Sequence, residues 1–196
     1  MNLPLFPLSS MLFPGCQLDL QLFEPRYLDM LGRCLKQGSG FGVVGILEGR
    51  EVGVAATQFS PVGCEALIRD WQQLPNGLLG IRVEGGRRFR VNSNWIEPDQ
   101  LTCGEIEWLE EAPEQPLLGQ HADLAALLQT LAEHPLVDNL NISGVANGQQ
   151  MLANQVAYLL PFSIEEKALL LELKSPLQRL EHIQILLEKL QGTLQA

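Results

Sequence analysis

The chain has 196 residues, of which 46% are hydrophobic and 18% are charged, and its formal net charge at pH 7 is -10. This length allows one domain or two small ones, and the apolar content is too high for a disordered chain. The acidic balance argues against a nucleic-acid partner, because proteins that bind phosphate backbones present a basic surface. It argues against an anionic membrane surface for the same reason.

Targeting and cysteine usage indicate a cytoplasmic protein. The first 14 residues are apolar but contain three prolines and no basic residue, which makes them a poor signal peptide. No run approaches the roughly 18 apolar residues of a membrane-spanning helix, so we expect no membrane partner. The cysteines form no C-x-x-C pair and are expected to be reduced thiols: Cys16, Cys34, Cys64 and Cys103.

The first 109 residues show the alternation of strands. Leu79, Ile81 and Val83 alternate with polar or small residues, as in a strand with one buried face. Asn76-Gly77, just before this run, is a strong hairpin signal. We therefore predict a hairpin of strands near 64–73 and 78–84, a turn at Gly85-Gly86, and further strands near 41–47, 52–60, 87–96 and 102–108.

Helical spacing appears once in this first part and dominates after it. Pro25 suits a first helical turn and Gly38 suits a stop, so we predict a helix over 25–36. After residue 109, apolar residues recur at three- and four-residue intervals, and Ser163 with Glu166 forms a capping-box pattern. The predicted organisation is a β subdomain over 1–109, a linker over 110–119 and a bundle of about four helices over 120–196.

Motifs for catalysis or cofactor binding are missing from the sequence. The segment Gly40–Gly45 fits G-x-G-x-x-G, but it follows a predicted helix and is better interpreted as a buried strand. No P-loop and no nucleophile elbow occur. His121, His134 and His182 lack metal-ligand spacing and are interpreted as surface or helix-end residues. We therefore expect no catalytic residue, no cofactor and no metal.

Arg87-Arg88-Phe89-Arg90 is the one basic cluster. It could contact RNA phosphates with an interleaved aromatic ring, or it could anchor acidic peptide segments. The alternative is the solvent-facing edge of a strand whose Phe89 points inward. The acidic net charge favours this last interpretation.

The N-terminal prolines belong to three specific runs. These runs are Leu3-Pro4-Leu5-Phe6-Pro7-Leu8, Leu12-Phe13-Pro14-Gly15 and Leu22-Phe23-Glu24-Pro25-Arg26-Tyr27. Their order and spacing resemble the opening of the N-terminal, substrate-binding LON domain of Lon ATP-dependent proteases. Three later segments are similar to further family patterns: Phe41-Gly42-Val43-Val44, Val83-Glu84-Gly85 with Arg88-Phe89-Arg90, and residues 159–167. The resemblance extends over about residues 3–190.

The resemblance implies an α+β fold, in which a PUA-like β pseudo-barrel with one short helix is followed by a helical bundle. In Lon proteases this region captures substrate polypeptide, and separate ATPase and Ser–Lys peptidase modules follow it. Those modules are not among these 196 residues. The resemblance therefore implies a non-catalytic protein- or peptide-binding module, not an enzyme, that acts in protein quality control or proteolysis-related recognition.

The implied partners are unfolded or extended polypeptide segments, with a separate protease as a further candidate. An extended peptide can add to a strand edge while its apolar side chains enter a pocket, and prolines keep such an edge from aggregating. Core packing is the alternative role for Phe13, Phe23 and Tyr27, and an ion pair with a carboxylate such as Asp29 is the alternative for Arg26. The candidate contact residues are Leu12, Phe13, Phe23, Pro25, Arg26, Tyr27, Arg87 and Arg88.

Two other function classes remain open at this point. PUA-like folds also serve RNA-modifying proteins, although the net charge argues against an RNA-binding role here. A small-molecule-binding protein would need a pocket where barrel and bundle meet. The loop over 136–149 is either a flap over such a cleft or a simple connection, and the oligomeric state and the client are not indicated by the sequence.

Overall fold

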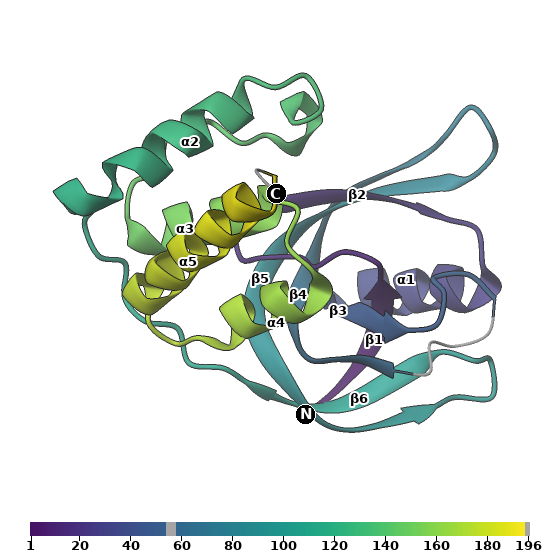
Figure 1. Cartoon of the computed structure of the whole chain (residues 1–196). Helices are drawn as coiled ribbons and strands as arrows, with labels where there is room; N and C mark the ends of the chain where they lie inside the picture. The colour runs from purple at the N-terminus through teal and green to yellow at the C-terminus, as the bar shows by residue number, and fades with distance from the viewer. Residues whose placement is uncertain (54–57, 195–196) are drawn as a thin grey trace.

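The computed structural model of the chain describes residues 1–53 and 58–194 (Figure 1). The strands are β1 (Asn2–Leu8), β2 (Gln17–Leu22), β3 (Phe41–Glu48), β4 (Gln58–Gln73), β5 (Leu79–Ile96) and β6 (Thr102–Trp108). The α-helices are α1 (Pro25–Gln37), α2 (Ala122–Ala132), α3 (Gln149–Leu159), α4 (Ile164–Glu172) and α5 (Pro176–Leu194), with 3-10 turns η1 (Gly119–His121) and η2 (Asp138–Leu140). No helix in the described part of the chain has the length and apolarity needed to cross a membrane.

The strands form a sheet that closes on itself. Their order is β2-β5-β4-β3-β1-β6, and an additional pairing of β5 with β6 completes a barrel from which β2 is left out. β1 and β3 are parallel, and the other pairs are antiparallel. This closure, followed by helices α2 to α5, confirms the predicted α+β fold with a pseudo-barrel and a bundle.

β4 and β5 are long enough to extend beyond the barrel. They have 16 and 18 residues, and their ends, joined at Asn76-Gly77, form the projecting hairpin in Figure 1 with β2 paired along β5. The hairpin turn is confirmed, because Gly77 has a φ of 82° and its N–H bonds to the Leu74 carbonyl at 2.9 Å. β2 therefore lies on the outside of a three-stranded extension of the barrel.

The predicted turn at Gly85-Gly86 is wrong, because β5 passes straight through it. The chain before β2 instead crosses β5 at this point. The N–H of Gly15 bonds to the Gly85 carbonyl, and the Gly85 N–H bonds to the Cys16 carbonyl, both at 2.8 Å. A Cβ on Gly85 would collide with the Phe13 backbone oxygen. The glycine therefore allows two backbones to approach closely. In the sequence, a glycine with this role looks the same as a glycine in a turn.

Two further strand predictions need adjustment. The expected strands at 52–60 and 64–73 merge into β4, in which only residues 58–60 of the first take part. Val52 and Gly53 are not in a strand, and residues 54–57 lie outside the described residues. The G-x-G-x-x-G segment lies in β3, as its interpretation as a buried strand predicts.

Local signals define the helices as expected. α1 begins at Pro25 and ends before Gly38, whose φ of 63° is the left-handed value of a helix stop. The predicted capping box at the start of α4 is present. The Glu166 N–H donates to Ser163 Oγ at 3.2 Å, and the Ser163 N–H donates to the Glu166 carboxylate at 2.9 Å.

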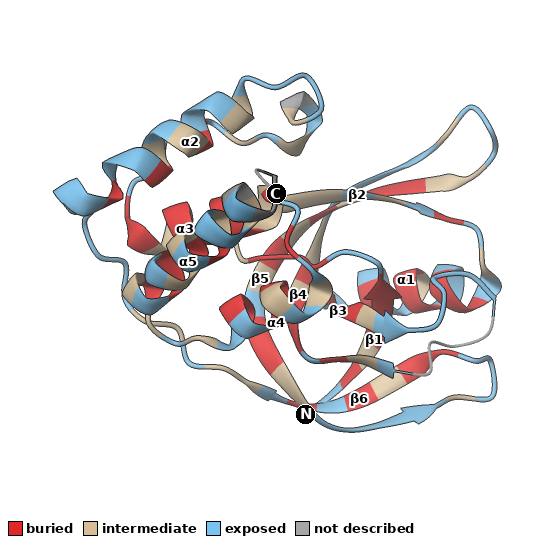
Figure 2. Ribbon diagram, in the orientation of Figure 1, coloured by how far each residue is buried: buried red, intermediate tan, exposed pale blue. Residues whose placement is uncertain are grey.

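One continuous core joins the barrel to the helices. Buried residues of the β half, such as Met11 and Phe13, belong to the same apolar cluster as Leu152 and Leu171 of the bundle. Figure 2 shows this buried layer between α4 and the strands behind it. A smaller cluster fills the barrel interior and consists of Leu3, Leu5, Val44, Phe89 and Ile106. The larger core thus extends from α1, past the barrel strands, into the bundle.

Candidate functional site

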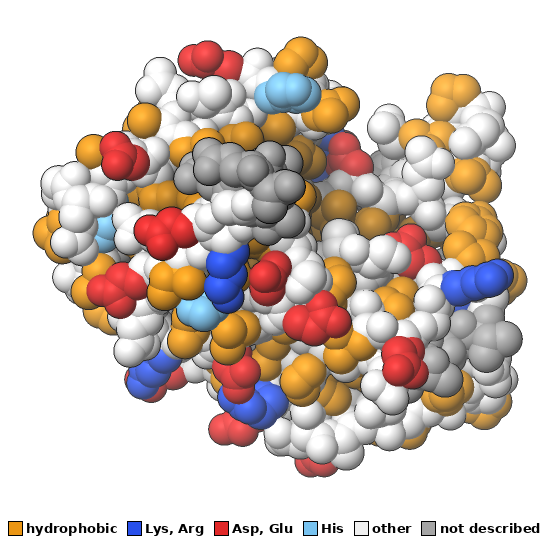
Figure 3. Space-filling view, viewed as in Figure 1, with side chains coloured by type: hydrophobic (Ala, Val, Ile, Leu, Met, Phe, Trp, Pro, Cys, Tyr) orange, Lys and Arg blue, Asp and Glu red, His pale blue; other side chains and the backbone are white. Residues whose placement is uncertain are grey.

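An apolar groove lies between β2 and the barrel wall that carries α1. Its free volume is about 160 Å³. Figure 3 shows hydrophobic side chains exposed on this side of the molecule, below the tip of the β4–β5 hairpin. We call it the β2 groove, and its lining residues are Phe6, Leu8, Asp19, Leu20, Gln21, Leu22, Phe23, Glu24, Tyr27, Glu51 and Val52.

The floor of the β2 groove follows from strand alternation. Leu18, Leu20 and Leu22 lie on one face of β2, and Leu22 is buried while Leu20 is half-buried. Opposite them, the rings of Phe6 and Tyr27 pack with their centroids 4.1 Å apart. Apolar side chains from three separate elements thus converge beside the outer strand.

Phe23 stands apart from this packed floor. It follows β2 directly, and 49% of its surface is exposed. An exposed aromatic ring beside an apolar depression is a surface that can bury more area when a partner arrives.

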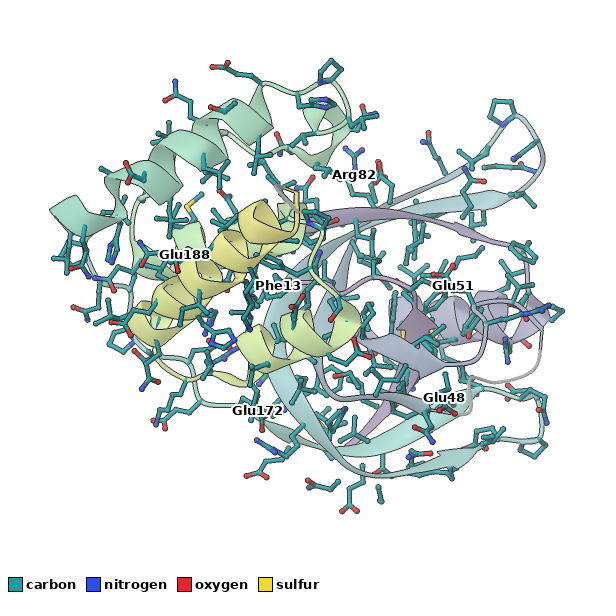
Figure 4. All side chains as sticks on the ribbon, in the orientation of Figure 1. Phe13, Glu48, Glu51, Arg82, Glu172 and Glu188 are labelled. Atoms are coloured by element: carbon teal, nitrogen blue, oxygen red, sulfur yellow. The ribbon has the colours of Figure 1, made fainter. Side chains whose placement is uncertain are left out.

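Carboxylates surround the β2 groove. Glu24 pairs with Arg26 at 2.9 Å and accepts the Gly53 N–H at 3.4 Å, while Glu51 accepts the Ser9 N–H at 2.5 Å. Figure 4 labels Glu51 on the side of β2 that faces α1. Burial raises the pKa of Tyr27, and these two glutamates add to the rise while Arg26 opposes it. The electrostatic character of the groove is therefore acidic.

Asp19 points to the other face of β2. Its two carboxylate oxygens accept hydrogen bonds from Nε and Nη2 of Arg82, each at 2.7 Å. The hydrogen bond from Arg82 is the main reason why the pKa of Asp19 lies below its usual range. Asp19 therefore anchors β2 to β5 and has little capacity left for a ligand.

Two of the predicted contact residues line the β2 groove, and two more are their neighbours along the chain. Phe23 and Tyr27 line it, and Pro25 is exposed at the start of α1. Arg26 is buried and pairs with Glu24 rather than with Asp29. Its guanidinium also lies 4.7 Å from the centre of the Tyr27 ring and donates a hydrogen bond to the Gln100 carbonyl at 3.0 Å. Arg26 is therefore part of the framework that positions Tyr27.

The other predicted contact residues lie elsewhere. Leu12 and Phe13 are wholly buried, and Figure 4 shows Phe13 between the helices and the barrel. Arg87 is exposed, with its guanidinium 3.8 Å from the centre of the Trp108 ring and 3.4 Å from Glu65. Arg88 is wholly buried. None of these four residues lines the β2 groove.

The arginine cluster does not form a basic surface. Phe89 points into the barrel core, as predicted, but Arg88 faces the bundle instead of solvent. Each arginine has a carboxylate partner: Arg87 pairs with Glu65, Arg88 with Glu111 and Arg90 with Glu172. These pairs neutralise the charge that an RNA phosphate backbone would need.

Several lining residues were not identified from the sequence. Phe6, Leu8, Leu20 and Val52 come from three elements that are distant along the chain. The alternation of Leu18, Leu20 and Leu22 is a signal that could have identified β2. The strand has only six residues, and it is not among those predicted from the sequence. Only the fold brings these segments together.

Histidine and cysteine side chains are the other groups with reactive chemistry. No group of three or more His, Cys, Asp or Glu side chains among the described residues could hold a metal ion. His121 is buried at the start of α2 rather than on the surface, and its Nδ1 accepts the Leu118 N–H at 3.2 Å. Burial raises the pKa of Cys16 to about 12 and that of Cys64 well above its usual range, so both are protonated thiols.

A second depression lies where barrel and bundle meet. The segment after α2 contributes Leu136, Val137 and Leu140 to its wall, and the ammonium of Lys167 donates to the Tyr158 carbonyl at 2.9 Å beside it. Burial lowers the pKa of Lys167. The lysine thus satisfies the carbonyl end of α3, which is a structural role.

Comparison with known proteins identifies the family. The model of the ATP-dependent protease La (LON) substrate-binding domain matches residues 2–189. The chain is 23% identical to a Lon protease of Flavobacterium johnsoniae over 97% of its own length, and 26% identical to Lon protease 1 of Hydrogenovibrio crunogenus over 87% of its length. It spans only 25% and 22% of those proteins, about a quarter of each.

Solved structures agree with this assignment. The Lon N-terminal domain protein from Xanthomonas campestris has 33% sequence identity and a TM-score of 0.77, with 94% of this chain and 98% of that chain covered. The N-terminal domain of Mycobacterium avium complex Lon protease has the same fold at 17% identity and a TM-score of 0.62, with 93% and 96% covered. Because the family model matches almost every residue, the chain belongs to the Lon substrate-binding domain family.

Proposed function

We propose that this chain is a non-catalytic module that binds exposed apolar segments of unfolded or extended polypeptides at the β2 groove. The observation that carries the proposal is the half-exposed ring of Phe23 beside an apolar depression, in a member of a substrate-binding family. Phe23 and Tyr27 are the proposed contact residues, and Pro25 extends the same surface. Arg26 positions Tyr27 beside the groove, whereas Leu12, Phe13 and Arg88 belong to the core elsewhere in the fold.

The size of the β2 groove suits one or two client side chains. Burying a Leu or Phe side chain stabilises a complex by about 1.5–3 kcal/mol, before the cost of ordering the client is subtracted. A single contact of this kind is weak and exchanges quickly. Such binding tolerates many sequences, which is the property required of a module that samples unfolded chains.

The biological setting is part of the same proposal. The matched relatives are Lon proteases, so we place the module in protein quality control in the cytoplasm, where it presents bound segments to a proteolytic partner. Its own residues bind the segment and perform no chemistry. Any cleavage of the client takes place on another module or protein.

The proposal is tested by titration with an unfolded protein. Reduced, S-carbamidomethylated lysozyme is added to the labelled chain, and backbone NMR shifts are followed. We expect chemical-shift changes concentrated around Phe23 and Val52. Phe23→Ser should weaken binding about tenfold, because the complex then lacks the apolar contact of the Phe23 ring.

A matched control is available on α5. Ile185 is 48% exposed, close to the 49% of Phe23, but it does not line the β2 groove. Ile185→Ser should bind like the wild type. Equal losses in both variants, or shifts spread evenly over the surface, would show that binding is nonspecific and reject the β2 groove as the site.

A further inference from the structure

The outer edge of β2 has no strand partner in the described part of the chain. β2 pairs with β5 from Gln17 opposite Glu84 to Leu22 opposite Leu79, and it is the terminal strand of the sheet order. An unpaired edge presents backbone N–H and C=O groups that can pair with another chain.

The direction of these backbone groups follows from two hydrogen bonds. The Cys16 carbonyl accepts the Gly85 N–H at 2.8 Å and therefore faces β5. The next carbonyl, of Gln17, accepts the Tyr158 hydroxyl at 2.7 Å and faces away from β5. Because these directions alternate along a strand, the N–H and C=O groups of Asp19 and Gln21 also face outward. Among residues 1–53 and 58–194, no hydrogen bond to these four groups is found.

The β2 groove runs along β2. Its lining includes every residue from 19 to 24, with Phe6, Leu8, Tyr27 and Val52 across from them. In a strand added to the outer edge of β2, alternate side chains would lie on the face that carries Leu20 and Leu22, which is the face toward the groove.

We propose that a short extended segment adds to the outer edge of β2 as an extra strand, with its alternate side chains in the β2 groove. This inference rests on the proposed function and specifies how the client is held. Backbone pairing to Asp19 and Gln21 supplies affinity that is independent of sequence. The groove then selects an apolar side chain at every second position.

The charges define the rest of the client. Glu51 lines the groove with no ion pair to a basic side chain among the described residues, whereas Glu24 is paired with Arg26, and the chain as a whole has a net charge of -10. The segment that fits therefore carries Lys or Arg beside its apolar residues. Tyr158 bounds the available edge on one side and Phe23 bounds it on the other, which leaves room for roughly four residues at about 3.3 Å each.

The test uses one peptide in three forms. The parent is fluorescein-labelled Lys-Thr-Val-Thr-Leu-Thr-Val-Lys, with apolar residues at alternate positions. In the first derivative, two of the apolar residues are N-methylated. In the second derivative, two of the threonines are N-methylated instead. Only one of these two sets of N–H groups can face β2 in an added strand. We expect one derivative to bind within about twofold of the parent and the other at least about tenfold more weakly, because it loses two hydrogen bonds.

A pair of variants tests the same edge from the side of the protein. Gln21→Pro removes one outward N–H, and proline is tolerated at strand edges. Because Gln21 also lines the groove, Gln21→Ala, which loses the same side chain but keeps the N–H, is the reference variant. We expect peptide affinity to be about fivefold to tenfold lower in Gln21→Pro than in Gln21→Ala. Thermal unfolding of both variants shows that they are folded.

The outcomes separate the two proposals. If the parent peptide binds, Phe23→Ser weakens it and both N-methylated forms bind equally well, the groove function stands and the added strand is rejected. If the parent peptide and unfolded lysozyme both fail to bind, the proposed function fails. If size-exclusion chromatography with light scattering shows a dimer that Gln21→Pro dissociates, a second copy occupies the edge and the extended client is rejected.

Discussion

Arg88 of β5 donates a hydrogen bond of 2.7 Å to the carbonyl of Leu171 near the end of α4, although its side chain is wholly buried. The same guanidinium bonds to the Leu173 carbonyl at 2.8 Å and to Glu111 at 2.8 Å. One cation thus satisfies the final carbonyls of a helix and a carboxylate from the segment after β6. This contact fixes the bundle against the barrel.

The first prediction concerns this contact. Arg88→Ala should lower the free energy of unfolding by about 3–5 kcal/mol, because it leaves buried carbonyls and Glu111 without their donor. Urea denaturation measures the change. Arg87→Ala is the control, since Arg87 is exposed and its ion pair with Glu65 is worth at most about 1 kcal/mol. Similar losses in the two variants would show that Arg88 is not the link between the two halves.

The second prediction is that barrel and bundle unfold together, because they share one core. All three tryptophans, Trp71, Trp95 and Trp108, lie in the β half, so fluorescence reports on the barrel while circular dichroism at 222 nm is dominated by the helices. The two denaturation curves should coincide. Phe13→Ala should shift both by the same amount, about 3–5 kcal/mol. Two separate midpoints would mean that the halves are independent subdomains.

The third prediction concerns the crossing at Gly85. Gly85→Ala should destabilise the protein by about 2–3 kcal/mol or prevent folding, because the added Cβ meets the rigid Phe13 carbonyl. Gly86→Ala is the matched neighbour, whose Cβ would meet the movable end of Glu65 at 2.9 Å and should cost much less. Thermal unfolding compares the two, and the opposite order would contradict the crossing.

The fourth prediction concerns the acid side of the stability profile. The pKa of Asp19 is lowered in the folded protein by Arg82. The ion pair therefore stabilises the fold above the unfolded pKa of about 3.9, and this contribution is lost as the pH falls through the lower, folded pKa. Its size is less than about 1 kcal/mol because both side chains are partly exposed.

An NMR titration of the Asp19 carboxyl carbon measures this effect directly. In Arg82→Gln the pKa of Asp19 should return toward its usual value, and the difference in stability between variant and wild type should vanish at low pH. An unchanged pKa in Arg82→Gln would show that the guanidinium is not the cause.

Sequence reasoning succeeded where the signal is local. The capping box at Ser163, the stop at Gly38 and the hairpin at Asn76-Gly77 depend on residues within a few positions of one another, and each is present in the structure. The α+β fold was predictable from the strand-like and helix-like apolar periodicity of the two halves, together with the family resemblance.

It failed where distant segments determine a residue's role. The glycines at 85 and 86 predict a turn, and this prediction is wrong. Gly85 is needed instead because the Phe13 backbone, far away along the chain, packs directly against it. Arg88 and Arg87 are neighbours with opposite environments, and only the position of the bundle decides which one is buried. The sequence predicts only part of the β2 groove. The predicted lining residues lie next to Pro25 along the chain, whereas the others come from β1, β2 and the turn after β3.

The central claim is that clients contact the β2 groove, and site-specific photo-crosslinking tests it most directly. Benzoylphenylalanine replaces Phe23 in one sample and Ile185 in another, and each is irradiated with unfolded, S-carbamidomethylated lysozyme. The account predicts efficient cross-links from position 23, mapped to apolar segments next to Lys or Arg, and few from position 185. Equal yields from the two positions, or cross-links from position 185 alone, would contradict it.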